Sequence, residues 1–456
     1  MFKGGNDMKL KKLCITALMM TFISSMVSGC SSESKADVYF LNFKPESAAT
    51  YEKIAADYEK ETGVKIKIET AASSTYEQTL KSEIAKSTAP TIFQINGPVG
   101  YQNWKDYCAD LKDTDLYNYL SDQSLAVTNE GGVYGIPYVV EGYGIIYNNT
   151  IMQKYFELTD KTVDVTSIND INNYDMLSKV VEDMTNHKEE LGIEGVFAST
   201  SLGAGAQWRW QTHLANLPFY YEFKDNTEFD NSTLAGLSAK EIEFKYADNY
   251  KNIFDLYINN SCTAPSMLGS KSVDDSMAEF ALGKVAMVQN GNWAWSQIND
   301  IDGNVVTEDA VKFLPIYIGI DGEESQGLCI GTENYFAINN QVSDDAKQKS
   351  IDFLEWLFSS ETGKKYVVDD LGFIAPFNTF NEDEKPADPL AKEVMNWMNK
   401  DGITSVPWTF AAFPSEKFKD DFGSALLEYA QGQKGWEDVV TTVKVSWKAE
   451  VAAKAE

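Results

Sequence analysis

The stretch Asp37-Val38-Tyr39-Phe40-Leu41-Asn42-Phe43 begins the pattern that decides the fold class. Its apolar run predicts a buried strand, and residues 46–61 follow with helical spacing that ends at Gly63. Residues 64–69 alternate as a strand does, residues 76–87 predict a second helix, and residues 91–95 a third strand. Strand–helix repeats of this length predict right-handed βαβ units and a mostly parallel sheet, so we expect an α/β protein.

The turns after the first and third strands are candidate ligand positions. Sheets of this kind bind ligands beyond the carboxyl ends of their strands. That places Asn42, Lys44 and Glu46 after the first strand, and Asn96 after the third, near a candidate site. Each of these residues is also common in ordinary turns.

A second informative stretch is Gln289-Asn290-Gly291-Asn292-Trp293-Ala294-Trp295-Ser296-Gln297. It follows the apolar run 285–288, which predicts a buried strand, and its glycine allows a tight turn. Two tryptophans at i and i+2 cannot both face the interior of a helix squarely. Either both tryptophans are core residues, or at least one lines a site.

Residues 133–148 form a β-rich run that contains one carboxylate, Glu141. A carboxylate in a buried strand is costly unless it is paired or lies in a solvated cleft. We expect Glu141 to face a cleft; a structural glutamate in a salt bridge is the alternative.

The only arginine of the chain, Arg209, stands between Trp208 and Trp210, with His213 nearby. Core packing of Trp210 is the ordinary outcome for such a residue. Gly203 and Gly205 precede the segment and favour a turn that faces a cleft. Arg209 and Trp210 are therefore candidate ligand contacts.

Composition excludes several classes of function. A chain of 456 residues exceeds one ordinary core and predicts two lobes. A net charge of −29 opposes binding to nucleic acid, and a single arginine opposes phosphate sites built on guanidinium forks. Cys108, Cys262 and Cys329 form no CxxC motif; we expect isolated buried thiols, although one disulfide is possible.

The first thirty residues predict a targeting segment rather than part of the fold. Lysines precede the apolar run 13–26, and Val27-Ser28-Gly29-Cys30 follows it. This tetrad resembles the lipobox of bacterial lipoproteins, which implies that 1–29 is a signal peptide and that Cys30 is acylated. Residues 30–36 would be a tether, and the lipid would hold the protein on the outer face of the cell membrane.

No nucleophile, phosphate-binding, zinc or dinucleotide motif occurs in the chain, so we expect a binding protein without metal or cofactor. Strands are predicted over 313–317 and 333–338. Helices are predicted over 346–358, 389–400 and 415–452. A surface-anchored carbohydrate-active enzyme is the rival from another class.

Several of these features together resemble the extracellular solute-binding proteins of sugar ABC transporters, in particular the group that contains maltose-binding protein. The features are the lipobox, the first strand and helix, the runs 136–141 and 146–148, and the run 290–296. The resemblance implies a two-lobed, type II periplasmic-binding-protein (Venus-flytrap) fold, with crossovers near 141–146, 312–316 and 338–346. It implies an N-terminal lobe of 37–142 and 314–345 and a C-terminal lobe of 143–313 and 346–456.

The resemblance also assigns roles. Glu141 matches an acceptor of sugar hydroxyls and Trp293 an aromatic that stacks on a pyranose, which leaves Trp295 as the packed residue. Lys44 and Asn96 fall where the family often places cleft residues, and Asn96-Gly97-Pro98 departs from the family's charged pair there. Near the C-terminus, Trp408 and Phe413 both remain candidates for a further cleft aromatic.

The expected function is therefore that of a monomeric receptor that delivers an oligosaccharide to the membrane permease subunits of an ABC importer. A malto-oligosaccharide is the leading expectation. Xylo-, manno- and α-galacto-oligosaccharides are the alternatives.

Overall fold

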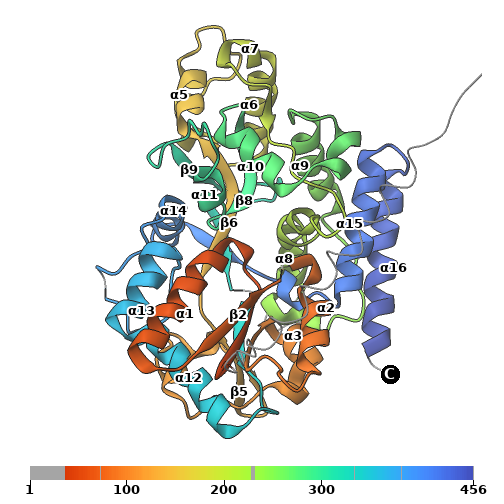
Figure 1. Ribbon diagram of the computed structural model, residues 1–456. Helices are drawn as coiled ribbons and strands as arrows, with labels where there is room; N and C mark the ends of the chain where they lie inside the picture. The colour runs from red at the N-terminus through yellow and green to blue at the C-terminus, as the bar shows by residue number, and fades with distance from the viewer. Residues whose placement is uncertain (1–35, 72, 227–231, 333, 382, 455–456) are drawn as a thin grey trace, which may run out of the picture.

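The computed structural model describes residues 36–71, 73–226, 232–332, 334–381 and 383–454. These residues form two lobes, each built on one mixed sheet covered by helices (Figure 1). The expected α/β class is confirmed. The predicted signal peptide 1–29, Cys30 and nearly all of the tether 30–36 lie outside the described residues.

The sheet of the first lobe has the strand order β2-β1-β3-β11-β5-β4. Its strands are β1 (Val38–Asn42), β2 (Ile66–Thr70), β3 (Ile92–Asn96), β4 (Val127–Asn129), β5 (Gly132–Pro137) and β11 (Asn334–Ile338). The expected βαβ repeat forms its parallel part, because β1 pairs in parallel with both β2 and β3. The sheet as a whole is mixed rather than mostly parallel, since β11 pairs antiparallel with β3 and β5.

The helices of the first lobe cover both faces of this sheet. They are α1 (Ala48–Thr62), α2 (Ser73–Ile84), α3 (Gly97–Trp104), α4 (Asp115–Asn118), α12 (Asp344–Ser359) and α13 (Glu361–Lys365). Helix α1 buries Tyr51, Ile54 and Tyr58 on one face, as its spacing predicted. It ends at Gly63, which adopts a left-handed φ of 78°.

The sheet of the second lobe has the order β12-β10-β6-β8-β7, and β9 also pairs with β6. Its strands are β6 (Glu141–Asn148), β7 (Gly195–Phe197), β8 (Val285–Gly291), β9 (Val311–Leu314), β10 (Gln326–Gly331) and β12 (Thr404–Pro407). Every residue of β6 and β8 is buried, as expected for strands covered on both faces.

Helices surround this second sheet. They are α5 (Asn149–Glu157), α6 (Tyr174–Asn186), α7 (Lys188–Leu191), α8 (Asn216–Asp225), α9 (Ala247–Asn259), α10 (Val273–Ala281), α11 (Ala294–Asn299) and α14 (Pro389–Met398). The chain ends with α15 (Glu416–Ala430) and α16 (Trp436–Lys454), which run side by side along one flank of the molecule (Figure 1). Phe418, Phe422 and Trp447 join these two helices to the core of the second lobe.

The packing corrects the expected division of the chain between lobes. Strand β10 belongs to the second sheet, although 314–345 was assigned to the N-terminal lobe. Phe353, Phe358 and Phe377 belong to the core of the first lobe, although 346–456 was assigned to the other. The reason is hydrogen bonding and burial: Gly331 pairs with Glu141, and α12 covers the first sheet.

The crossovers move accordingly. The chain passes between the lobes from β5 to β6, from β10 to β11, and between Phe377 and α14. The expected crossover near 141–146 lies beside the first of these. The expected crossovers near 312–316 and 338–346 are wrong, because β9 and β10 share the second sheet and because β11 and α12 share the first lobe.

No helix within the described ranges is both long and apolar enough to span a bilayer. Cys108, Cys262 and Cys329 are free thiols, two of them buried and Cys262 partly exposed. The expectation of isolated buried thiols is therefore confirmed for Cys108 and Cys329, whereas Cys262 is unpaired but partly exposed.

Candidate functional site

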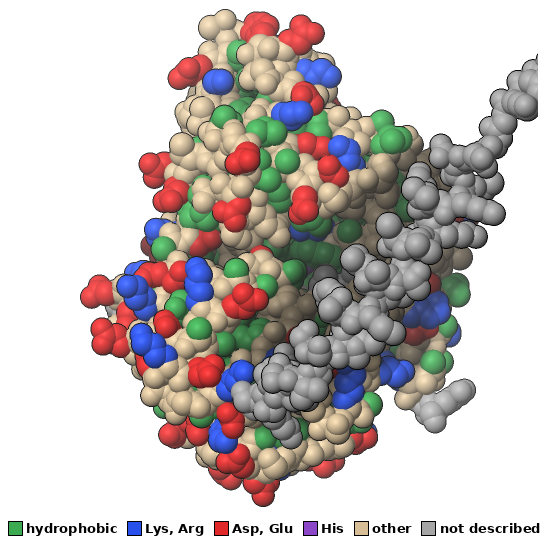
Figure 2. All heavy atoms as spheres, viewed as in Figure 1, with side chains coloured by type: hydrophobic (Ala, Val, Ile, Leu, Met, Phe, Trp, Pro, Cys, Tyr) green, Lys and Arg blue, Asp and Glu red, His purple; other side chains and the backbone are tan. Residues whose placement is uncertain are grey.

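A cavity of about 860 Å³ lies between the two lobes. Figure 2 shows the surface hollowed there, with hydrophobic side chains inside the hollow. The first lobe contributes Phe43, Lys44, Pro45, Glu46, Glu77, Gln78, Asn96 and Asn334. The second lobe and the first crossover contribute Glu141, residues 204–209, 211–213, Val273, Asp274, Trp293, Gln297, Trp408, Glu416, Lys419, Asp420 and Ser424.

Trp293 is positioned by the turn that ends β8. A Cβ atom at Gly291 would overlap the indole ring, so the glycine is required for the ring to lie against the strand end. The side-chain oxygen of Asn292 accepts from the N–H of Gly142 at 2.9 Å, and the N–H of Asn292 donates to the carbonyl of Gly142 at 3.0 Å. These bonds hold Trp293 beside Glu141. Trp295, in contrast, is 8% exposed and packs in the core, as expected.

Glu141 lines the cavity and is also paired. Its Oε1 atom lies 2.6 Å from Nζ of Lys44, and both side chains are buried. Burial raises the pKa of Glu141, and the positive charge of Lys44 opposes that shift. The ammonium also lies 6.0 Å from the centre of the Trp293 ring and 3.7 Å from Glu46. The two expectations for Glu141, a cleft residue and a paired one, are therefore met together.

Asn42 shapes the turn that presents Lys44. Its side chain accepts from the N–H of Lys44 at 3.0 Å and donates to the Lys44 carbonyl at 2.7 Å. Asn42 is fully buried and is not part of the cavity lining. The expected ligand contact at Asn42 is thus replaced by a structural role, because both polar ends of its amide already bond to neighbouring groups.

Arg209 enters the cavity stacked on Trp208. Its guanidinium carbon lies 3.8 Å from the centre of the Trp208 ring, and its Nε donates to Asn290 at 3.3 Å. Gln289 fixes the backbone by donating to the Arg209 carbonyl at 2.7 Å. Burial lowers the pKa of Arg209 from its ordinary value. Strand β8 therefore positions both Trp293 and Arg209.

Trp208, which was not among the predicted contacts, takes the place expected for Trp210. Trp208 is partly exposed in the cavity, and its ring lies 5.9 Å from that of Trp293 at 50°. Trp210 is 2% exposed, donates to the carbonyl of Ser201 and packs on Phe254. Residues two positions apart on a helical backbone face different directions, so only one of this pair can reach the cavity.

Trp408 lines the cavity, whereas Phe413 lies in the core against Phe219 and Trp447. Asn216 fixes the Trp408 segment by bonding to the backbone on both sides of it, at Pro407 and Thr409. The indole packs closely over Gly331, where a Cβ atom would lie 2.7 Å from the ring. Asn96, at the end of β3, lies opposite Asn334 of β11, and both line the cavity.

Several buried polar groups of the cavity lining make no hydrogen bond to another described residue. Among the described residues, buried side-chain atoms without a hydrogen bond include three N–H donors in the lining: Arg209 Nη1, Trp293 Nε1 and Trp408 Nε1. They also include three amide oxygens there, from Gln211, Gln297 and Asn334, together with Nε2 of His213. Burial lowers the pKa of His213 well below its usual range, so the ring is neutral. Buried polar groups are normally satisfied, and a cluster of exceptions indicates a place for a polar ligand.

Two lobes joined by three crossovers, with an aromatic and polar cavity between them, define a ligand-capturing protein of the two-lobed binding class. Residues 53–393 match the model of the bacterial extracellular solute-binding proteins, and the chain belongs to that family. The expected resemblance to solute-binding proteins of sugar ABC transporters is confirmed. Proteins of this family bind solutes and are not enzymes, so the rival enzymatic reading is set aside.

Individual relatives are distant in sequence, and the solved structure compared below shares the fold. The multiple sugar-binding protein of Streptococcus mutans is 21% identical over 96% of both chains. The melibiose/raffinose/stachyose-binding protein MelE of Bacillus subtilis is 27% identical over 32% of this chain and 37% of its own. A chitin oligosaccharide binding protein superposes with a TM-score of 0.70 at 20% identity, covering 91% of this chain and 98% of that one.

Proposed function

We propose that this protein captures a neutral oligosaccharide between its lobes and delivers it to the permease of an ABC importer. The observation that carries the proposal is the set of unpartnered donors and acceptors in one cavity. A hydroxyl group both donates and accepts, so a polyhydroxylated ligand can satisfy both kinds of group. An anion would satisfy the N–H donors and leave the amide oxygens of Gln211, Gln297 and Asn334 unpaired.

The aromatic lining supports the same class of ligand. Trp208, Trp293 and Trp408 all border the cavity. A pyranose has a face of C–H groups that packs on an aromatic ring, while its hydroxyl edge takes hydrogen bonds. One cation of the lining, Lys44, is already paired with Glu141 and Glu46, so its charge does not require an anionic ligand.

Both lobes contribute residues to the cavity lining, which supports capture of the ligand by closure of the two lobes. Lys44, Asn96 and Asn334 belong to the first lobe, whereas Trp208 and Trp293 belong to the second. A ligand that contacts both sets favours the closed arrangement by its difference in affinity for the two states. The permease would then receive a protein whose conformation reports that it is loaded.

Two classes of oligosaccharide are our candidates for the ligand. Malto-oligosaccharides remain our first candidates, and one solved structure of this fold, with a TM-score of 0.66, is described as maltose-bound. Galactosides of the raffinose type are the second, since MelE is named for such sugars and another similar structure contains raffinose. The lining itself is compatible with either, because both present hydroxyls and pyranose faces.

Isothermal titration against a glycan panel tests the proposal. The panel contains maltotriose, raffinose, stachyose, xylotriose, mannotriose and chitotriose, with galacturonic acid trimer as an anionic control. We expect saturable heat with at least one neutral glycan, none with the anionic one, and no shortening of the sugar after incubation. Absence of heat with every neutral glycan, or release of shorter sugars, would refute the proposal.

We also propose that a lipid on Cys30 anchors the protein outside the cell membrane. The support is the targeting pattern of residues 1–30 together with membership of an extracellular family. Cys30→Ser should abolish incorporation of labelled palmitate and release the protein from the membrane fraction. Continued membrane attachment of that variant would contradict the anchor.

A further inference from the structure

We infer that Glu279 is a positioning residue of the cavity, holding in place the segment that presents Trp208 and Arg209. Glu279 lies on α10 and is not part of the cavity lining. The inference rests on the proposed function, because it concerns how the same cavity obtains its affinity for a sugar.

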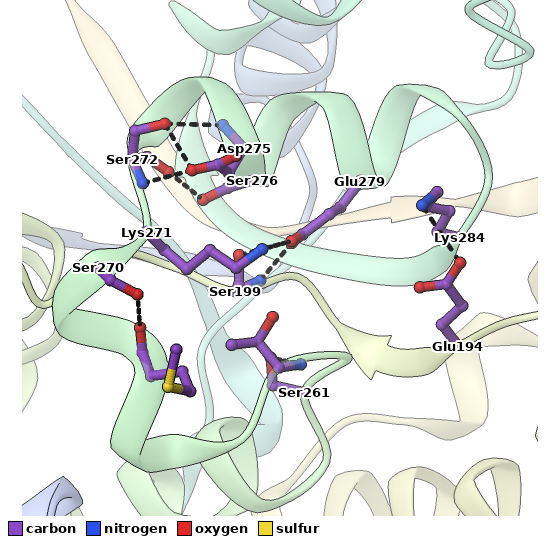
Figure 3. A network of polar contacts seen from close by, with 12 residues as sticks. Glu194, Ser199, Ser261, Ser270, Lys271, Ser272, Asp275, Ser276, Glu279 and Lys284 are labelled. Atoms are coloured by element: carbon purple, nitrogen blue, oxygen red, sulfur yellow. Dashed lines mark hydrogen bonds and ion pairs between the residues drawn. The ribbon is translucent and has the colours of Figure 1, made fainter.

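Glu279 is the centre of a buried polar network (Figure 3). Its Oε2 accepts from the N–H of Ser199 at 2.7 Å, and its Oε1 accepts from the Ser199 hydroxyl at 2.8 Å. Nζ of Lys271 lies 2.9 Å from the same Oε1. The carboxyl side chain is 11% exposed. Charge-assisted bonds of this kind are about twice as strong as neutral ones, so Ser199 is held firmly.

The network continues along the chain toward the cavity. The hydroxyl of Ser201 donates to the Lys271 carbonyl at 2.6 Å and accepts from the N–H of Gly203 at 3.1 Å. The Ser201 carbonyl accepts from the indole of Trp210 at 3.0 Å. Residues 204–209 follow directly and line the cavity. The bonded residues 199–203 therefore lead directly into the segment that carries the Trp208–Arg209 stack, and β8 holds the far end of that segment through Gln289 and Asn290.

Through Lys271, the network also reaches the start of α10, where two further residues line the cavity. Ser272 caps α10 through a capping box with Asp275, and the next residues, Val273 and Asp274, border the cavity. Lys271 thus joins the start of α10 to Glu279 and, through its carbonyl, to Ser201. The network sets the spacing between residues 204–209 and the beginning of α10.

A purely stabilising role does not require a carboxylate here. Burying an ion pair is often no better for stability than a well-packed apolar residue of similar size. What an apolar residue cannot do is bind the N–H of Ser199, its hydroxyl and Lys271 at once. The distinctive contribution of Glu279 is therefore the geometry of the segments it connects.

A control carboxylate is Glu194, which directly precedes β7 and pairs with Lys284. Glu194 and Lys284 form an ion pair at 3.3 Å with side chains 60% and 43% exposed (Figure 3). Within the described part of the chain, this pair makes no hydrogen bond or ion pair to residues 199–203. Glu194→Gln removes a carboxylate of the same type without touching the network around Glu279.

The test compares Glu279→Gln, Ser199→Ala and Glu194→Gln by hydrogen–deuterium exchange of the ligand-free protein and by titration. Amides of residues 200–209 should exchange faster in the first two variants and at the wild-type rate in the third. For maltotriose, or the panel glycan that wild type binds most tightly, we expect about tenfold weaker binding in Glu279→Gln, since bonds to a buried charge are lost. Ser199→Ala should lose about threefold, since one neutral hydrogen bond is removed.

A double variant separates positioning from general destabilisation. If Glu279 acts through Trp208, Glu279→Gln combined with Trp208→Ala should lose less affinity than the product of the two single losses. Wild-type affinity and exchange in Glu279→Gln, or additive losses with Trp208→Ala, would overturn the inference. If Glu279→Gln does not fold, Ser199→Ala decides, and wild-type behaviour there overturns it. Failure of wild type to bind any neutral glycan overturns the proposed function instead, and the exchange of residues 200–209 still tests the network.

Discussion

Replacement of Trp293 by alanine tests the cavity most directly. Stacking on one pyranose would cover about 50 Å² of the ring, a quarter of the area that a buried tryptophan contributes in full. At about 25 cal/mol per Å², that contact is worth about 1.3 kcal/mol. The unpartnered Nε1 of Trp293 can add one hydrogen bond, worth about 1 kcal/mol. A loss of about 2 kcal/mol corresponds to roughly 30-fold weaker binding.

Titration with the best glycan of the panel measures this loss, and two variants separate its components. Trp293→Phe keeps an aromatic face but removes the N–H, so it should fall between wild type and Trp293→Ala. Trp295→Phe changes the packed tryptophan two residues along and should lower the melting temperature while leaving affinity unchanged. Unaltered binding by Trp293→Ala would refute the stacking role and place Trp293 with the core.

Three other outcomes are expected. Arg209→Lys should weaken glycan binding about fivefold by titration, because an ammonium cannot keep both the planar stack and the free Nη1 donor. Glu141→Gln should lower both affinity and melting temperature, because it leaves the buried Lys44 ammonium without its closest counter-charge. His187 caps the end of α6, and bonding to the Asp183 carbonyl raises its pKa. A raised pKa means that the protonated His187 ring stabilises the folded state. This contribution is present in full below the pKa of about 6.5 in the unfolded chain, and it is lost as pH rises through the higher pKa of His187 in the folded protein. His187→Gln should therefore melt further below wild type at about pH 5.5 than at about pH 9 in thermal unfolding scans.

Local patterns predicted the elements of this protein well and their distribution between lobes poorly. The helical spacing of α1 reflects burial on one face, and the continuous apolar runs of β1 and β3 reflect burial along the whole strand, so each pattern is present in the segment's own residues. Strand β10 is different, since nothing in residues 326–331 records that its partners are β6 and β12 rather than β11. The position of a crossover depends on which distant strands pair with each other. The periodicity of one segment contains no information about that pairing.

The site shows the same division. The family resemblance assigned Trp293 to the cavity and left Trp295 as the packed residue, and the structure has Trp293 in the lining and Trp295 buried. Their spacing alone left open whether both are core residues. Trp208 and Trp210 have the same spacing, but no neighbouring residue distinguishes them. Their assignment depends on the π-helical turn of Arg209–Leu214 and on the bond from Trp210 to Ser201. Both tryptophans flank the only arginine, so that arginine marks the segment but does not distinguish Trp208 from Trp210.

That single arginine has a practical consequence. Arg209 supplies the only arginyl peptide bond of the chain, and the residue is 4% exposed between the lobes. An arginine-specific protease thus has one place to cut, and a guanidinium-selective dicarbonyl reagent has one place to react. Modification of Arg209 would report the opening motion proposed above in unlabelled protein, and cleavage would report local unfolding of the helical turn Arg209–Leu214.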